Sequence, residues 1–287
     1  MKRLLIANRA EIACRVIRTA HEMGIETVAV YSDVDASALH VQQASTSYAL
    51  GGNSPAESYL HIEKIIQAAL ATRSDAIHPG YGFLSENPDF AQAVIDAGLI
   101  WVGPSPASIR LLGNKAAAKR LAQQAGVPCL PGYDGLDEYG LVSEYSQSNA
   151  VMQEHADKIG YPLMVKAMNG GGGRGMRKVD KSADLLSALE SARQEAKNAF
   201  NDSSVLLERA LLAPRHIEVQ IFGDGKGNVL ALGERDCSVQ RRHQKIVEEA
   251  PSPAVNSELR ARMGEAALKL VHATNYVGAG TVEFLLD

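Results

Sequence analysis

The most informative segment of this 287-residue sequence is Lys166-Ala167-Met168-Asn169-Gly170-Gly171-Gly172-Gly173-Arg174-Gly175. It continues an apolar run that predicts a strand over Leu163–Ala167. Glycine has no Cβ, so consecutive glycines allow backbone N–H groups to turn toward an anion and approach it closely. An ammonium group at the end of an apolar strand is costly unless an anion compensates its charge. Lys166 and the glycines after it therefore predict a phosphate-binding loop.

One other interpretation of this segment stays open, because a glycine-rich surface turn with an extended lysine would have the same composition. The Walker pattern is excluded, since Lys and Ser/Thr do not follow the last glycine. The dinucleotide fingerprint is excluded as well. It requires glycines that open a helix after the first strand, where this chain has Asn8-Arg9-Ala10-Glu11.

The sequence before the glycine segment alternates strand and helix patterns. The predicted strands are Leu4–Ala7, Thr27–Tyr31, Ala76–Ile77 and Leu99–Val102, and the predicted helices are Glu11–Met23 and Ser58–Ala71. Strands separated by helices predict a doubly wound parallel sheet with both faces covered. We assign residues 1–113 to this N-terminal domain, and residues 114–130, with a helix over Ala116–Gln124, to a link.

The pattern changes after residue 130. A polar connection over Pro131–Asn149 precedes a helix that ends at Ile159 and a second helix over Ala183–Phe200, and residues 131–203 predict a small lid. The remaining predicted strands are Val205–Glu208, His216–Phe222, Val229–Glu234 and Gly280–Leu286, with a helix over Glu258–Ala273. Consecutive strands imply a mostly antiparallel sheet over residues 204–287. The predicted fold class is α/β together with α+β.

Composition excludes some classes of function. The net charge is −4, and the one dense basic group, Arg241-Arg242-His243-Gln244-Lys245, has no interleaved aromatic residues. A nucleic-acid surface is therefore not expected. No segment approaches the roughly 20 apolar residues of a membrane span, and the apolar run at the N-terminus is too short for a signal peptide.

The three cysteines, Cys14, Cys129 and Cys237, are widely separated and form no C-x-x-C pair. Neither a structural zinc site nor a disulfide framework is expected. A reducing compartment, the cytoplasm, is the expected location.

Two further sites contain polar residues in unusual positions. Glu283 lies in an apolar strand, so its carboxylate must face solvent, an ion pair or a metal such as Mg²⁺. The cluster from Glu234 to Lys245 follows a predicted strand directly. It is either a solvated loop or a set of donors for an oxyanion and a ribose. Sequence spacing does not choose between these alternatives.

Taken together, these motifs resemble the biotin carboxylase subunit or domain of biotin-dependent carboxylases, over the whole chain. The segments that carry the resemblance are Leu5–Ala13, His78–Asn87, the Lys166 glycine loop, Pro214–Gln220, Glu234–Lys245 and Gly278–Leu285. Details such as Glu57-Ser58-Tyr59-Leu60 look most like α subunits of acyl-CoA carboxylases, especially the methylcrotonyl-CoA type.

The resemblance implies an ATP-grasp enzyme, an ATP-dependent ligase that joins bicarbonate to biotin through carboxyphosphate. It implies ATP and Mg²⁺ as cofactors, with Mn²⁺ as a substitute, and biotin as a carried substrate. The implied partners are bicarbonate, biotin on a carrier segment and a carboxyltransferase subunit, and a homo-oligomer is left open. No nucleic acid or membrane partner is implied.

The resemblance also implies roles for individual residues. The implied nucleotide-binding residues are Lys115, Lys166, Gly171, Gly172, Gly173, Arg174, Gly175, Glu208, Leu211, His216, Gln240 and His243. Lys115 and Lys166 would hold phosphates, and Glu208 would meet adenine. Lys245 would orient bicarbonate or carboxyphosphate, with Arg241 as a second catalytic residue. Glu283 would ligate magnesium.

Some features depart from the family pattern. Ala10 stands where the family normally has glycine, and the connection over residues 134–149 looks longer than usual. The family continues into segments that supply a second magnesium carboxylate, a bicarbonate-binding arginine and a general base. Since Asp287 precedes them, we expect a C-terminally truncated chain that binds nucleotide without turnover. The alternatives are another ATP-grasp carboxylate ligase and a non-catalytic nucleotide-binding or scaffold module.

Overall fold

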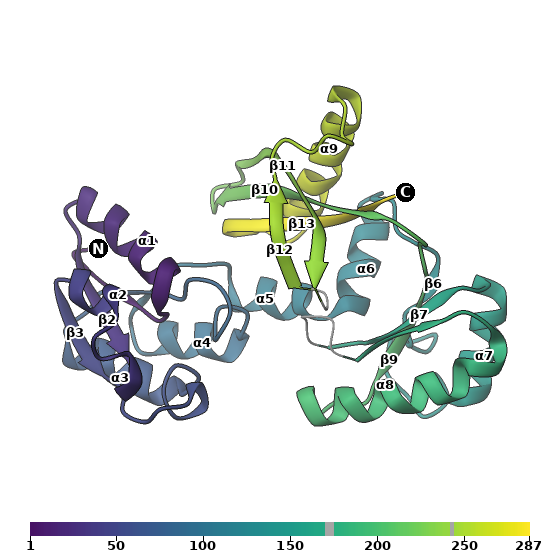
Figure 1. Ribbon diagram of the computed structural model, residues 1–287, viewed down its shortest axis with the longest axis horizontal. Helices are drawn as coiled ribbons and strands as arrows, with labels where there is room; N and C mark the ends of the chain where they lie inside the picture. Colours follow the sequence, from purple (N-terminus) through teal and green to yellow (C-terminus); the bar gives the residue numbers. More distant parts are fainter. Residues whose placement is uncertain (170–174, 242–243) are drawn as a thin grey trace. The chain divides into compact units, whose positions relative to one another are not determined.

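The computed structural model of the chain describes residues 1–169, 175–241 and 244–287 (Figure 1). The chain forms two compact units, Met1–Arg110 and Leu111–Asp287. Each unit has its own sheets and its own apolar core. The predicted combination of a parallel N-terminal sheet with antiparallel sheets after it is confirmed. No helix in the described part of the chain is both long and apolar enough to span a membrane.

The N-terminal unit contains a five-stranded parallel sheet in the order β3-β2-β1-β4-β5. Its strands are β1 (Arg3–Ile6), β2 (Glu26–Tyr31), β3 (Thr46–Ala49), β4 (Ala76–His78) and β5 (Ile100–Trp101). The strand order reverses between β1 and β4, as it does in doubly wound folds. The predicted strands match four of these five within a residue or two at each end, and β3 was not predicted.

The helices of this part of the chain are α1 (Ala10–Glu22), α2 (Leu39–Gln43), α3 (Ile62–Ala71), α4 (Pro88–Asp96) and α5 (Pro106–Gly113). The prediction of a helix from Ser58 was wrong over its first turn. Ser54 and Glu57 form a capping box around a short 3₁₀ helix, Pro55–Glu57, and Ser58 ends that turn. The chain therefore enters α3 only at Ile62.

Ala10 has a backbone φ of 57°, in the left-handed region that favours glycine. The family that the sequence resembles normally has glycine at this position. The structure supplies the physical reason for that preference, because a Cβ in this conformation is strained.

His40 on α2 is completely buried. Its Nε2 lies 3.3 Å from the carbonyl oxygen of Val30, and its Nδ1 has no hydrogen-bond partner among the described residues. Burial lowers the pKa of His40 below its ordinary value, and the neighbouring charges of Asp35 and Arg9 act in opposite directions. Burial lowers the pKa of His78 in the same way.

These two histidines predict a pH-dependent stability for the N-terminal unit. As pH falls through the ordinary histidine value, the unfolded chain binds protons that the folded unit does not. The free energy of unfolding should therefore decrease as pH falls below about 6.5, until the pH reaches the lowered pKa values of the two histidines in the folded unit. Urea unfolding between about pH 7.5 and 5.5 measures this slope. His40→Leu should flatten it, whereas His21→Gln, at an exposed histidine of α1, should not. An unchanged slope in His40→Leu would contradict the contribution of the buried His40 to this pH dependence.

The second unit begins with α6 (Lys115–Gln124) and a four-stranded antiparallel sheet in the order β6-β9-β7-β8. Its strands are β6 (Gly132–Tyr133), β7 (Leu163–Ala167), β8 (Met176–Val179) and β9 (Val205–Arg209). Helices α7 (Asn149–Ile159) and α8 (Leu185–Phe200) pack on this sheet (Figure 1). β9 pairs with β7, and Val205 and Leu207 belong to the same core. The sheet therefore extends past the boundary that we predicted at residue 203.

The second sheet of this unit is also antiparallel, in the order β12-β11-β10-β13. Its strands are β10 (Arg215–Asp224), β11 (Val229–Arg241), β12 (Gln244–Glu249) and β13 (Val277–Leu286). Helix α9 (Ser257–Ala273) packs on this sheet (Figure 1). Residues from β10, β13 and α9 share one core.

The polar cluster after Glu234 is not a loop. β11 continues through it to Arg241 and pairs with β12. Polar residues can occupy this strand because the charges on it are compensated. Glu234 is buried and accepts two hydrogen bonds of 2.7 Å from Arg260 on α9. Asp236 is buried and accepts from Arg215 and Ser252. The prediction that the strand ends at Glu234 was wrong for this reason.

Candidate active site

Glu218 on β10 is the buried centre of one group of predicted residues, with a side chain only 4% exposed. Its Oε1 accepts a hydrogen bond of 2.6 Å from Nε of Arg235, and its Oε2 forms an ion pair with Lys245. Burial alone would raise the pKa of Glu218, but Lys245 and Arg235 outweigh it, so the pKa lies below its usual range. Glu218 is therefore an ionised carboxylate held by two cations.

Lys245 on β12 joins this carboxylate to Glu283. Its Nζ lies 2.7 Å from Oε1 of Glu283, which is the cross-strand partner of Glu218 in the β10–β13 pair. Two carboxylates directly opposite one another repel unless a cation lies between them. Burial lowers the pKa of Lys245, but the two carboxylates outweigh this effect and raise it. Lys245 therefore stays positively charged at neutral pH.

His216 and Gln240 complete this network. The Gln240 amide donates to Nδ1 of His216 over 2.6 Å and to the carbonyl oxygen of Cys237 over 2.8 Å. An accepting Nδ1 places the ring proton on Nε2, which lies 3.4 Å from Glu283. The His216 contact, together with Lys245, outweighs burial and lowers the pKa of Glu283 to about 2. In this structure the Glu283 carboxylate is paired with Lys245 and lies near His216, and its role as a magnesium ligand stays a prediction.

The structure does not bring every predicted residue to this network. Arg241 lies at the end of β11 and is exposed, and within the described residues it makes no hydrogen bond or ion pair with the Glu218 network. Its predicted catalytic role stays a prediction. His243 lies outside the described residues.

The second group of predicted residues centres on Glu208 of β9. Its Oε2 forms an ion pair with Lys166 of β7, and its Oε1 accepts from Nζ of Lys119, on α6, over 2.8 Å. Burial raises the pKa of Glu208, but Lys166 and Lys119 together lower it below its usual range. The anion that compensates Lys166 is therefore Glu208, and the lysine does not extend into solvent.

Lys115 is positioned by the first turn of α6. Its backbone N–H donates to the carbonyl oxygen of Met168 over 3.2 Å. Asn114 caps α6 through a hydrogen bond from Ala117 N–H and also bonds the side chain of Asn169. These contacts hold Lys115 beside the end of the strand segment that leads into residues 170–174.

The glycine loop itself is described only at its end. Gly171, Gly172, Gly173 and Arg174 lie outside the described residues. Gly175 has a φ of 68°, and a Cβ there would lie 2.8 Å from that of Ala167. Only glycine fits this position without displacement. Leu211 follows β9 and is half-buried.

Two models of known protein families match the chain. Residues 1–109 match the family model described as "Biotin carboxylase, N-terminal domain". Residues 114–287 match that described as "Carbamoyl-phosphate synthase L chain, ATP binding domain". The chain belongs to the biotin carboxylase family.

Individual members of the biotin carboxylase family are similar over the whole chain. The α subunit of mitochondrial methylcrotonoyl-CoA carboxylase from Rattus norvegicus is 53% identical over 99% of this chain and 39% of its own length. The biotin carboxylase of Nostoc is 51% identical over 99% of this chain and 62% of its own length. A structure of biotin carboxylase from Campylobacter jejuni in a β,γ-ATP complex superimposes with a TM-score of 0.93 at 46% identity, covering 100% of this chain and 62% of that one. The chain thus spans about two-fifths to three-fifths of the lengths of these relatives.

Three residues of the two groups around Glu218 and Glu208 carried no predicted role: Glu218, Arg235 and Lys119. Glu218 had the same signal as Glu283, a carboxylate between apolar strand residues, and could have been found by it. Arg235 lay inside the polar cluster without a distinguishing pattern. Lys119 had no signal, because it occupies an ordinary position on a polar helix.

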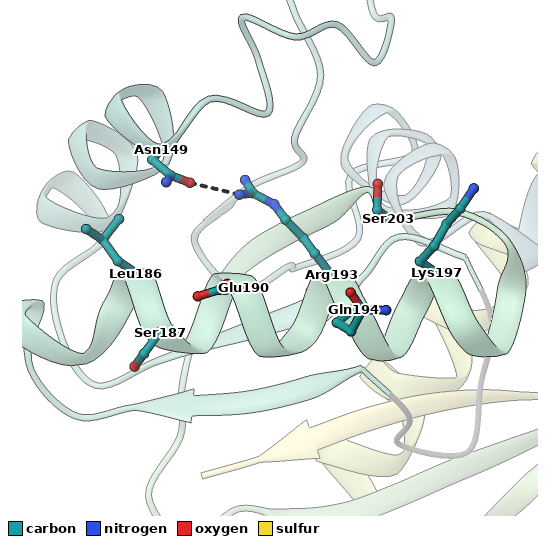
Figure 2. Close-up of a pocket in the computed structure, with 8 residues that line it drawn as sticks. All are labelled: Asn149, Leu186, Ser187, Glu190, Arg193, Gln194, Lys197 and Ser203. Atoms are coloured by element: carbon teal, nitrogen blue, oxygen red, sulfur yellow. Dashed lines mark hydrogen bonds between the residues drawn. The ribbon is translucent and has the colours of Figure 1, made fainter.

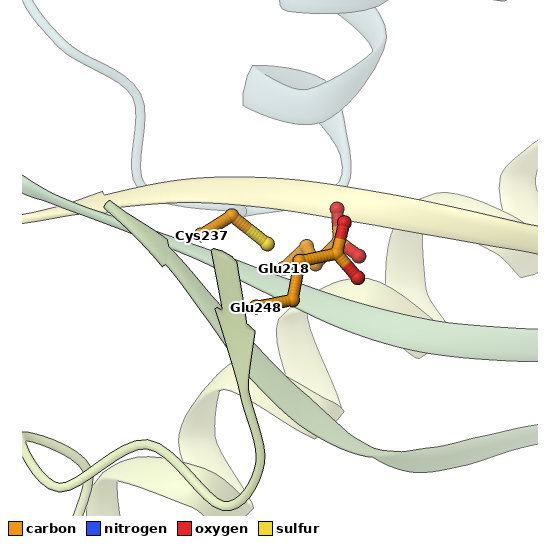
Figure 3. A group of neighbouring side chains, drawn as sticks. All are labelled: Glu218, Cys237 and Glu248. Carbon is orange, nitrogen blue, oxygen red and sulfur yellow. The ribbon is translucent and has the colours of Figure 1, made fainter. Parts of the chain in front are cut away.

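A second interpretation of the Glu218 group is a metal centre, because Glu218, Cys237 and Glu248 lie close together (Figure 3). A thiol must lose its proton to ligate a metal. Burial raises the pKa of Cys237 to about 11, and Lys245 and Arg235 already occupy both oxygens of Glu218. Glu218 is therefore engaged by two cations in this structure, and we do not base a proposal on this group.

A hollow of about 640 Å³ lies along α8 and contains none of the predicted residues (Figure 2). Arg193 points across it and donates to Asn149 over 2.8 Å and to the carbonyl oxygen of Gln147 over 2.5 Å. The guanidinium therefore ties α8 to the start of α7. The hollow thus lies where α8 is bonded to the start of α7. The candidate site consists of the two groups around Glu218 and Glu208.

Proposed function

We propose that this chain is the nucleotide-binding part of an ATP-dependent biotin carboxylase. The observation that carries the proposal is the largely buried pair of lysines on one carboxylate, Lys119 and Lys166 on Glu208, with Lys166 on the strand that precedes the glycine segment in the sequence. Two ammonium groups on one carboxylate leave a surplus positive charge, which suits a polyphosphate. A Hydrogenobacter thermophilus biotin carboxylase domain with TM-score 0.92 is named as a complex with MgADP and bicarbonate, which supports the same ligands here.

The whole protein is proposed to carboxylate biotin with bicarbonate, as part of an acyl-CoA carboxylase of the methylcrotonyl-CoA type. ATP supplies the phosphoryl group that activates bicarbonate. Lys115 and Lys166 would neutralise phosphate charge, and Lys245 would orient bicarbonate. The Glu283 carboxylate is half-exposed and ionised, so it fits the oxygen ligand that Mg²⁺ prefers. These residues position and stabilise charge, which is the main requirement of phosphoryl transfer.

The proposed partners are biotin on a carrier segment and a carboxyltransferase subunit. The 53% identity to an α subunit of a carboxylase supports them. We also propose a reducing compartment, the cytoplasm, because Cys14, Cys129 and Cys237 are all free thiols.

Calorimetric titration of MgATP into the chain tests the proposal. We expect binding that Lys166→Ala weakens by about 1–3 kcal/mol, the usual loss for a hydrogen bond to a charged group. Lys158→Ala is the matched control, because Lys158 is exposed and its ion pair is with Glu154 on its own helix. Equal affinity in Lys166→Ala and the unmodified chain would contradict the phosphate role of Lys166. Absence of MgATP binding to the unmodified chain would contradict the proposed function.

A further inference from the structure

The Glu208 carboxylate is bonded to two lysine side chains. Each of its oxygens has its own ammonium partner, Lys166 on Oε2 and Lys119 on Oε1. The three side chains are only 15%, 19% and 14% exposed, in the order Glu208, Lys166, Lys119. Charges this far removed from water need compensation, because an unpaired one is strongly destabilising.

One carboxylate needs only one ammonium group for neutrality, so one of the two lysines is surplus. Lys166 lies on β7, whose chain continues toward the glycine segment that predicts phosphate binding. Lys119 lies on the second turn of α6 and reaches Glu208 from a different element. Lys166 is thus the lysine placed to serve a phosphate, and Lys119 is the one placed to stay with the carboxylate.

The neighbouring strand leaves room for Lys119. Gly132 on β6 is the cross-strand partner of Glu208. A Cβ at Gly132 would lie 2.7 Å from Nζ of Lys119 and 2.4 Å from the carbonyl oxygen of Leu207. Any larger residue at this position would displace the ammonium group. The ammonium group of Lys119 therefore occupies the space that the missing Cβ of Gly132 leaves free. Its contact with Glu208 is not that of a freely moving surface lysine.

We propose that Lys119 is a positioning residue that keeps Glu208 compensated when Lys166 transfers from Glu208 to a nucleotide phosphate. This inference rests on the proposed function. Without Lys119, the transfer would leave a largely buried carboxylate alone. Lys166 would then remain on Glu208, and the phosphates would lose its contact. The role concerns the phosphates. In Lys119→Met the Glu208 carboxylate that would meet adenine is still present and paired with Lys166, so adenosine binding should not depend on Lys119.

The test compares MgATP with adenosine in calorimetric titrations of Lys119→Met. We expect MgATP binding to weaken about tenfold or more, the cost of a lost charged hydrogen bond, and adenosine binding to stay unchanged. Lys119→Arg should restore MgATP binding, because it restores the positive charge. In the Glu208→Gln background, which already carries any loss of the adenine contact, adding Lys119→Met should weaken MgATP binding no further, since a neutral amide needs no counter-charge.

Equal weakening of MgATP and adenosine would show a merely structural role and overturn the inference. Unchanged MgATP binding in Lys119→Met would overturn it as well, and so would a further loss when Lys119→Met is added to Glu208→Gln.

A measurement without nucleotide separates this inference from the proposed function. The rate of Lys166 acetylation by acetic anhydride, relative to that of exposed Lys158, reports how tightly Glu208 holds Lys166. We expect this rate to fall in Lys119→Met, where Lys166 becomes the sole partner, and to rise in the double variant Lys119→Met/Glu208→Gln. An identical rate in Lys119→Met and the unmodified chain would overturn the inference, whether or not the chain binds MgATP.

Discussion

Replacing Glu218 by alanine is expected to lower the free energy of unfolding of the C-terminal unit by about 3 kcal/mol. The carboxylate is almost fully buried and holds Lys245 and Arg235 together. Its removal leaves two cations side by side without their shared anion. The loss should fall at the lower end of the range for broken buried ion pairs, because Lys245 retains Glu283 and Arg235 retains a 3.6 Å contact with Glu248.

Urea unfolding followed by far-UV circular dichroism measures this loss. Glu218→Gln keeps the shape of the side chain and should still destabilise the unit, since the charge is what the two cations require. Glu248→Gln is the matched control on the same network, because Glu248 is 45% exposed and lies farther from Arg235. It should change stability little, as exposed pairs usually contribute below about 1 kcal/mol. A loss in Glu248→Gln as large as that in Glu218→Ala would contradict the central place of Glu218.

Replacing Phe90 by alanine is expected to destabilise the N-terminal unit by about 3–5 kcal/mol. Phe90 on α4 is completely buried and packs edge-to-face on Trp101 at a ring-centroid distance of 5.4 Å. Truncation removes the transfer free energy of the ring and leaves a cavity in the core against the sheet.

The chain has a single tryptophan, so Trp101 fluorescence reports directly on this core during urea unfolding. Phe90→Leu should recover much of the loss, because it fills most of the cavity. Ile95→Ala is the control on the same helix, since Ile95 is 44% exposed. If Phe90→Ala unfolded at the same urea concentration as Ile95→Ala, the ring would not be the core residue that the structure indicates.

The arrangement of helices and strands was largely predictable because it depends on local patterns. Alternating strands and helices indicated the parallel sheet, and consecutive strands indicated the antiparallel one. The antiparallel pairing of β11 with β12 was missed for a physical reason. In the sequence, charged residues such as Glu234 are typical of a solvated loop. In the structure, Arg260 on α9 compensates the charge of Glu234.

The candidate site was predictable only where one residue conflicts with its own surroundings. Lys166 at the end of an apolar strand and Glu283 within one both signalled that a partner was needed. Glu218 carried the same signal. Lys119 carried none, because nothing in a polar helix distinguishes one lysine from its neighbours.

By itself, the sequence determined the types of element, their parallel or antiparallel class, and the residues whose charge had to be compensated. Local periodicity and the cost of burying charge are sufficient for these conclusions. Only the tertiary structure decided which partners compensate them. Cross-strand register sets Glu218 opposite Glu283, with Lys245 bonded to both, and the approach of α6 to β9 gives Glu208 its second lysine. Such pairings join residues tens of positions apart, and their geometry arises from register and packing, which spacing along the chain does not specify.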